Sequence, residues 1–243
     1  MSISRLAVVD DHVLFAEAMV IALVNRGFEA RCVVPSENNP NGASLIAQVL
    51  AGKPDVVLLD LDLGEAADSL DMLARLSSVS TVVVVTGSSD PLLIGAALAA
   101  GATTVISKSS TFEQILDALF RLRDGLPAMS ERERERLLSR WREAGEFERE
   151  VKARFDLLTT REAEVLGELM VGRQVSEIAR RSFVSESTVR TQVKSVLSKL
   201  QVNSQLTAVG LAHRARWRAP GSGRLDRWGR PVAPTLPQPR ATA

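Results

Sequence analysis

The chain has 243 residues, of which 45% are hydrophobic and 24% are charged, a composition typical of water-soluble globular proteins. This length allows one large domain or two ordinary ones. The single cysteine, Cys32, excludes an internal disulfide framework, and the first residues lack the apolar core of a secretion signal, so we expect a cytoplasmic protein. Residues 91–107 carry no charge, but a helix, a glycine stop and a short strand explain them better than a membrane span.

Charge is divided unevenly along the chain. Residues 1–125 contain 8 Lys and Arg against 15 Asp and Glu, whereas residues 159–243 contain 14 basic residues against 6 acidic ones. The stretch between them, residues 126–158, contains 8 of each sign. An acidic first half and a basic second half predict two modules, of which the second binds a polyanion.

The first half alternates between short β-branched runs and helical patterns. Strands are predicted at residues 6–9, 28–34, 55–60, 81–86 and 103–107. Helices are predicted at residues 12–25, 43–51, 69–76, 91–100 and 111–123. Because several of the strands are apolar on both faces, we expect an α/β doubly wound, flavodoxin-like fold with a five-stranded parallel sheet.

Polar residues stand at the carboxyl ends of these predicted strands, where ligands of parallel sheets bind. They are Asp10, Asp11, Asp60, Thr86 and Lys108. Mg²⁺ prefers oxygen ligands and would offset the repulsion between the adjacent carboxylates. A lysine and a hydroxyl suit the oxygens of a phosphoryl group. Taken singly, each residue is more typical of a helix cap or a solvated surface, but their common position predicts a phosphoryl-transfer site.

Between residues 126 and 156 we predict a charged helical linker. Ser130 and Glu133 have the spacing of a capping box, and the charges that follow alternate in sign as on a solvated connector. The apolar residues of this segment could instead pack against a domain or a partner: Leu137, Leu138, Trp141 and Phe147. At the other end of the chain, residues 219–243 are rich in Pro, Gly and Arg, which predicts a disordered basic tail.

Residues 157–218 divide into four short helical patterns, which predict a small all-α domain. The third pattern begins after Ser185 and buries one apolar stripe, made of Val189, Val193, Val196, Leu197 and Leu200. Its opposite face is polar and basic: Ser187, Thr188, Arg190, Thr191, Lys194, Ser195 and Ser198. A brief helix, a tight turn and such a second helix are typical of a helix-turn-helix that reads the major groove of DNA. A plain helical bundle with a solvated face is the alternative, but that face has few acidic residues.

The first half resembles the receiver domain of bacterial two-component response regulators, over residues 5–123 and within a domain that we expect at residues 1–125. The motifs are the acidic pair in VVDD, LLDLDL with Asp60, VVVVTG with Thr86 and VISKSS with Lys108. The resemblance implies that Asp60 accepts a phosphoryl group from a sensor histidine kinase. It also implies that Asp10, Asp11, Asp60 and the main-chain carbonyl of Asp62 bind Mg²⁺, and that Thr86 and Lys108 bind phosphoryl oxygens.

Two features depart from the receiver pattern. Asp62 and Leu63 stand where many members have Met-Pro, and Val105 replaces the aromatic residue found three positions before the lysine. Val105 therefore supports an alternative, a phosphorylation-independent transcription factor that uses the receiver for dimerisation. A less favoured alternative is an aspartyl-phosphate phosphatase, because VVLLDLDLG also resembles the D-x-D motif of haloacid-dehalogenase-type phosphatases. In that family the further acidic pair follows the lysine, whereas here it precedes it.

The second half resembles the LuxR-type output domain of the NarL/FixJ response regulators, over residues 157–218. The resemblance implies that Arg190, Thr191 and Lys194 face the bases, and that Thr188, Lys199 and Arg181 bind phosphates. Ser187 completes the predicted DNA-binding surface. It also implies a homodimer through the fourth helix, near residues 203–213. We therefore predict a DNA-binding regulator controlled by phosphorylation, which is not an enzyme beyond assisting its own phosphoryl transfer and has no membrane partner.

Overall fold

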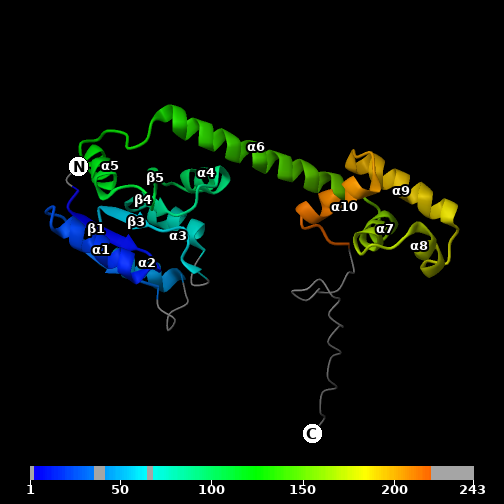
Figure 1. Ribbon diagram of the computed structural model, residues 1–243, viewed down its shortest axis with the longest axis horizontal. Helices are drawn as coiled ribbons and strands as arrows, with labels where there is room; N and C mark the ends of the chain where they lie inside the picture. Colours follow the sequence, from blue (N-terminus) through cyan, green and yellow to red (C-terminus); the bar gives the residue numbers. More distant parts are fainter. Residues whose placement is uncertain (1–2, 36–41, 65–67, 220–243) are drawn as a thin grey trace, which may run out of the picture. The chain divides into compact units, whose positions relative to one another are not determined.

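The computed structural model describes residues 3–35, 42–64 and 68–219 (Figure 1). The chain divides into two compact units, residues 1–144 (the N-terminal unit) and residues 145–243 (the C-terminal unit). The tail predicted at residues 219–243 lies outside the described residues except for Ala219. No helix in these described ranges is both long enough and apolar enough to cross a membrane.

The N-terminal unit is built on a parallel sheet of five strands in the order β2-β1-β3-β4-β5. Their bounds are β1 Arg5–Val9, β2 Glu29–Val33, β3 Val56–Leu59, β4 Thr81–Thr86 and β5 Thr104–Ser107. The central strands are buried on both faces, which explains why their sequences are continuously apolar. The predicted doubly wound fold is confirmed, with strand ends that differ from the prediction by at most one residue.

Helices cover both faces of this sheet. Their bounds are α1 Val13–Val24, α2 Gly42–Ala51, α3 Ser69–Leu76, α4 Pro91–Ala99 and α5 Phe112–Arg123. One core cluster joins α1 and α5 to one face of the sheet, and a second cluster joins α2, α3 and α4 to the other. Alternate residues of a strand supply the two clusters, as Val83 and Val84 of β4 illustrate, because successive side chains of a strand point to opposite faces.

The C-terminal unit contains four shorter helices: α7 Thr160–Met170, α8 Val175–Arg181, α9 Glu186–Leu200 and α10 Gln205–Arg214. Side-chain caps begin two of them: the Thr159 side chain accepts from the backbone N–H of Glu162, and the Ser185 side chain accepts from that of Thr188. The predicted apolar stripe of α9 packs into the two core clusters of this unit. The predicted four-helix domain is therefore confirmed.

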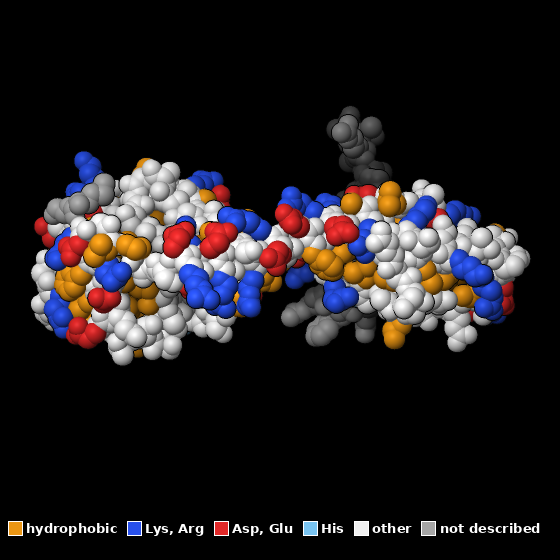
Figure 2. Space-filling model, turned by 90° about the horizontal axis from the view of Figure 1, so that it is seen from above, with side chains coloured by type: hydrophobic (Ala, Val, Ile, Leu, Met, Phe, Trp, Pro, Cys, Tyr) orange, Lys and Arg blue, Asp and Glu red, His pale blue; other side chains and the backbone are white. Residues whose placement is uncertain are grey.

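The charged segment between them forms one helix, α6 (Glu131–Asp156), which supplies apolar side chains to the core of each unit. The division between the two units falls inside this helix, after Ala144. Leu137, near its start, belongs to the core of the N-terminal unit. Val151 and Phe155, near its end, belong to the core of the C-terminal unit, where the Phe155 ring stacks on Trp217 with 5.2 Å between centroids. The charged residues of α6 remain on the surface, where side chains of both signs are interspersed (Figure 2).

Candidate functional site

Every polar residue predicted at a strand end lies at one edge of the sheet. Asp10 and Asp11 follow β1, Asp60 follows β3, Thr86 ends β4 and Lys108 follows β5. The side chains of Asp10, Asp60 and Thr86 are almost completely buried, with 2% of each residue exposed. Because the strands are parallel and neighbours in the sheet, their carboxyl ends bring together residues that are almost 100 positions apart.

The ammonium group of Lys108 holds this group of carboxylates together. Its Nζ lies 2.7 Å from Asp10 Oδ2 and 2.8 Å from Asp60 Oδ2, and it also lies 5.0 Å from the centroid of the Phe15 ring. Burial alone would lower the pKa of Lys108, but its hydrogen bonds to Asp10 and Asp60 outweigh this effect and raise the pKa above its ordinary value. The charged form of Lys108 is therefore favoured, and its positive charge offsets part of the carboxylate repulsion.

Burial also affects the Asp60 carboxyl group, because it disfavours the charged form. Burial raises its pKa above the usual value for aspartate, and hydrogen bonds from Lys108 and from the backbone of Asp62 oppose the rise without cancelling it. Its Oδ2 binds Lys108, whereas its Oδ1 is buried and accepts no hydrogen bond within the described part of the chain. One oxygen of the predicted phosphoryl acceptor is thus free to bind a ligand.

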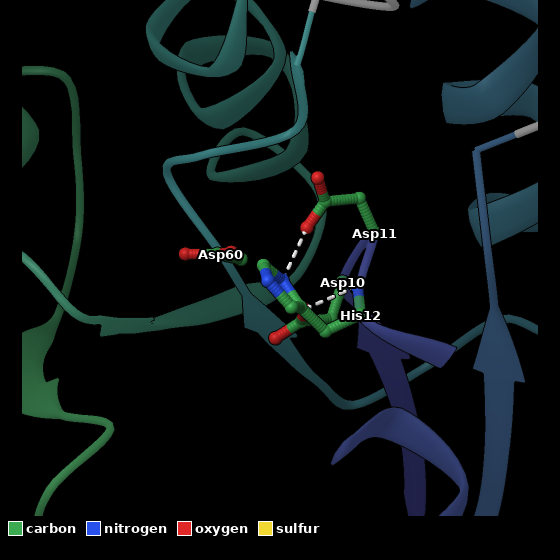
Figure 3. A group of neighbouring side chains, drawn as sticks. All are labelled: Asp10, Asp11, His12 and Asp60. Carbon is green, nitrogen blue, oxygen red and sulfur yellow. Dashed lines mark hydrogen bonds and ion pairs between the residues drawn. The ribbon is translucent and has the colours of Figure 1, made fainter. Parts of the chain in front are cut away.

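The acidic residues are close enough together to share one metal ion. Asp10, Asp11, His12 and Asp60 each offer a ligand atom, and these four atoms lie within 4.8 Å of one another (Figure 3). The Oδ1 of Asp60 is buried without a hydrogen bond within the described residues, whereas the Oδ1 of Asp11 lies 2.7 Å from Nδ1 of His12. Carboxylate oxygens at this spacing fit the ligand preference of Mg²⁺. The carbonyl of Asp62, predicted as a further ligand, stays a prediction.

His12 belongs to this cluster although the sequence reasoning did not select it. Its Nδ1 lies 2.7 Å from Asp11 Oδ1 and 3.4 Å from Asp10 Oδ1, and its backbone N–H donates to Asp10 Oδ1 at 2.9 Å. The sequence feature that could have indicated His12 is its place directly after the acidic pair, at the N-cap position of α1. The backbone bond orients Asp10, whereas the ring is largely exposed.

Thr86 faces the same hollow at the sheet edge as Asp60 and Lys108. Its hydroxyl oxygen accepts a hydrogen bond from the backbone N–H of Ser88 at 3.1 Å. The hydroxyl proton remains available to a ligand oxygen, because a hydroxyl group can accept and donate at the same time. The structure therefore combines a carboxylate with one free oxygen, one ammonium group and one hydroxyl in a single concave site.

The second group of predicted residues lies on α9. Ser187, Thr188, Arg190, Thr191 and Lys194 are all exposed, as a surface that meets DNA requires. Arg190 forms an exposed ion pair with Glu186, with 3.2 Å between its NH2 atom and Glu186 Oε2. Such an exposed pair is weak and can exchange for another acceptor. The hydroxyl of Thr191 donates to the backbone oxygen of Ser187 at 3.0 Å.

Lys199, predicted to bind a DNA phosphate, is engaged inside the C-terminal unit. Its Nζ lies 2.6 Å from Oε2 of the buried Glu162, and the hydroxyl of Ser195 donates to Glu162 Oε1, also at 2.6 Å. Burial would raise the pKa of Glu162, but hydrogen bonds from Lys199, Ser195 and Thr159 outweigh this effect and lower the pKa to about 2. This network joins α7 to α9 and fixes the position of the predicted recognition helix.

Comparison with known proteins identifies the two units. Residues 6–120 match the family model "Response regulator receiver domain", and residues 156–212 match "Bacterial regulatory proteins, luxR family". The "Probable transcriptional regulatory protein NarL" of Mycobacterium tuberculosis is 30% identical over 215 residues, which are 87% of this chain and 94% of that protein. The chain belongs to the NarL/FixJ family of response regulators.

Further relatives agree with this family. The "Nitrate/nitrite response regulator protein NarP" of Escherichia coli is 32% identical, with 84% of this chain and 92% of that protein covered. The "Transcriptional regulatory protein LiaR" of Bacillus subtilis is 27% identical over 86% of this chain and 97% of that protein. The protein is thus a DNA-binding transcriptional response regulator of the two-component type, with a receiver in its N-terminal unit and a LuxR-type helix-turn-helix in its C-terminal unit.

Replacing Lys108 by Met tests the role of the ammonium group in the receiver. We expect the free energy of unfolding to fall by about 2–4 kcal/mol at neutral pH, because two buried carboxylates lose their shared partner. Added Mg²⁺ should restore part of the loss by supplying positive charge to the same oxygens. Urea denaturation with and without Mg²⁺ measures both effects, and Lys53→Met, at an exposed lysine, is the control. A Lys108→Met receiver as stable as the wild type would contradict the role assigned to this ion pair.

Replacing Glu162 by Gln tests the network beneath the recognition helix. We expect the helix-turn-helix unit to lose about 1–3 kcal/mol of stability at pH 7, because Lys199 loses its charged partner. The folded pKa lies below the unfolded one, so the stabilisation is complete above about pH 4.5 and is lost as the pH falls towards 2. Urea denaturation at a series of pH values should show this slope in the wild type and not in Glu162→Gln. Glu164→Gln, at an exposed glutamate, should change neither quantity.

Proposed function

We propose that this response regulator is switched by phosphorylation of Asp60, with a sensor histidine kinase as the donor, and that phosphorylation promotes dimerisation and DNA binding. The observation that carries the proposal is the convergence of Asp60, Asp10, Asp11 and Lys108 at one edge of the sheet. A buried carboxylate with one free oxygen is a suitable nucleophile, and its neighbours supply both kinds of charge that phosphoryl transfer needs.

The reaction that these residues support is a single transfer. A carboxylate oxygen of Asp60 forms a bond to phosphorus while the bond from phosphorus to the donor imidazole nitrogen breaks, and that imidazole takes up a proton. The Lys108 ammonium can pass from the carboxylates to an oxygen of the bound phosphoryl group, and the Thr86 hydroxyl can donate to a second oxygen. The protein is thus the acceptor of the group, and we do not assign it an enzymatic turnover of its own.

The oxygens of Asp10, Asp11 and Asp60 would hold Mg²⁺ at this site, with the carbonyl of Asp62 as the further ligand that the family implies. When bound, the ion supplies positive charge that offsets the negative charge of the carboxylates and the phosphoryl group. His12 keeps Asp10 in place through its backbone N–H. We place the whole reaction in the cytoplasm, where the family's kinases present their phosphohistidine.

The C-terminal unit binds DNA through α9, and we propose that it does so as a homodimer on paired half-sites. The exposed polar residues of α9 support the assignment of this helix to the major groove. The family's dimer surface corresponds to α10, where Leu206 is 83% exposed. An apolar side chain this exposed supports contact with a second copy of the chain.

Replacing Asp60 by Asn tests the switch. We expect the wild-type chain to be labelled by a small phosphodonor in the presence of Mg²⁺ and to bind its operator more tightly afterwards, as footprinting would measure. Asp60→Asn should lose both the label and the change in affinity, because an amide cannot form the acyl phosphate. Asp62→Asn keeps its main-chain carbonyl and should behave as the wild type.

Other outcomes of this experiment distinguish the alternatives. A label that survives in Asp60→Asn would disprove the assignment of the acceptor. Equal DNA affinity before and after labelling would favour the phosphorylation-independent regulator. The absence of an aromatic residue at Val105 is the sequence feature that suggests this alternative. Repeated hydrolysis of a small phosphoester would favour the phosphatase.

Replacing Arg190 by Ala tests which kind of DNA contact α9 makes. We expect a loss of about 1–3 kcal/mol in binding to the preferred site and a relaxed preference at one base pair, because arginine pairs bidentately with guanine. Binding measured on a library of altered operators gives both quantities. A uniform loss on every sequence would instead assign Arg190 to a phosphate, and Arg149→Ala, on the exposed side of α6, should have little effect.

A further inference from the structure

A glycine in the middle of a receiver helix marks a close contact with α6. Gly95 is a buried residue of α4, although glycine is one of the poorest helix formers. A Cβ atom at this position would lie 2.6 Å from the backbone oxygen of Leu137 and 2.7 Å from the Cβ of Trp141. The absence of a side chain at residue 95 is therefore what allows α6 to lie against α4.

Further contacts hold the first turns of α6 on the same face of the receiver. The NH1 atom of Arg134 donates to the backbone oxygens of Ala102 and Thr103, each at 3.2 Å, just before β5. Leu137 is 5% exposed and belongs to the same core cluster as α4, and Val105 of β5 packs against that cluster. Residues 131–144 of α6 thus bind both α4 and the start of β5.

A series of local hydrogen bonds connects this contact to the phosphorylation site. Thr86 Oγ1 accepts from Ser88 N at 3.1 Å, and Ser88 Oγ accepts from Asp90 N at 3.2 Å. Asp90 in turn caps α4, with its Oδ1 accepting from Leu92 N at 2.9 Å. The loop between the Thr86 hydroxyl and the first turn of α4 is therefore tied at each step, so a displacement of Thr86 reaches α4 through a connected path.

We propose that residues 131–144 of α6 form a releasable latch on α4, and that phosphorylation of Asp60 shifts this latch towards an undocked state. A phosphoryl oxygen that accepts the Thr86 hydroxyl proton draws this side chain towards the site, which moves the loop at residues 87–90 that is bonded to it through Ser88, and with it the Gly95 face of α4. Contact at Gly95 tolerates little displacement, because two backbones meet there without a side chain that could adapt. The latch replaces the missing aromatic at Val105 as the element that reads the state of the site.

This latch has a direct route to the output domain. The helix that begins on α4 supplies Val151 and Phe155 to the core of the helix-turn-helix unit. A change in the first turns of α6 is therefore transmitted along one continuous helical backbone. This inference rests on the proposed phosphorylation for its trigger, but the docking contact itself can be tested separately.

Gly95→Ala in the full-length chain tests the contact without any phosphodonor. Alanine is the better helix former, so α4 itself should not be harmed, whereas the added Cβ pushes α6 away. We expect amide hydrogen exchange in residues 131–144 to become about tenfold faster, with the sheet of the receiver still protected. Gly145→Ala makes the same substitution at a helical position with open space around it and should not accelerate exchange. Arg134→Gln, which removes the two bonds to the start of β5, should act in the same direction as Gly95→Ala.

The wild type treated with Mg²⁺ and acetyl phosphate tests the trigger, with intact mass showing whether Asp60 has been modified. We expect faster exchange in residues 131–144 in the modified chain, and little further change when Gly95→Ala is modified. Modification without any change in exchange would overturn the latch and leave the proposed function standing. No modification would instead count against the proposed function and the trigger, while the Gly95→Ala result would still decide the docking contact. Unchanged exchange in both Gly95→Ala and Arg134→Gln would overturn the contact itself.

Discussion

The receiver depends on one ammonium group, that of Lys108, which lies between two buried carboxylates. Asp10 and Asp60 end neighbouring strands, and the register of the sheet fixes their separation, so they cannot move apart to relieve their repulsion. A neighbouring cation offsets this repulsion, and Lys108 supplies it from the end of β5, which lies two strands from β3 and three from β1. Burial and repulsion make this edge of the sheet expensive, and the same properties make it receptive to a metal ion and a phosphoryl group. The burial and the repulsion that lower the stability of the receiver therefore also make this site able to bind a metal ion and a phosphoryl group.

The two units use related devices for different purposes. In the receiver, Lys108 serves two carboxylates and leaves one oxygen of Asp60 without a partner, which suits a site that must react. In the C-terminal unit, Lys199 and Ser195 between them bind both oxygens of Glu162, and a backbone N–H completes the set. A buried carboxylate with hydrogen bonds to both oxygens has a structural role, and here it holds the recognition helix against α7. The completeness of the hydrogen bonding distinguishes the two roles.

The sequence predicted what depends on local pattern and on general rules of parallel sheets. The strands were recognisable from β-branched runs, and the meeting of Asp10, Asp60 and Lys108 followed from their places at strand ends. The partner of Lys199 was not predictable, because it depends on how α7 packs against α9, whereas the assignment of this lysine to a DNA phosphate came from the family resemblance. The division of α6 between two cores could not be predicted either, because it also depends on tertiary packing. Its apolar residues are few and widely spaced among charges, so nothing local reveals that Leu137 and Phe155 belong to different cores.

That division affects how the protein can be dissected. A fragment that stops at residue 125 omits Leu137 and uncovers the apolar surface of α4, and a fragment that starts at residue 157 omits Val151 and the ring on which Trp217 stacks. Either piece would expose hydrophobic surface and aggregate for reasons unrelated to its biology. The boundary that leaves both cores whole lies between Ala144 and Gly145, in the middle of a helix where no reading of loops would place it.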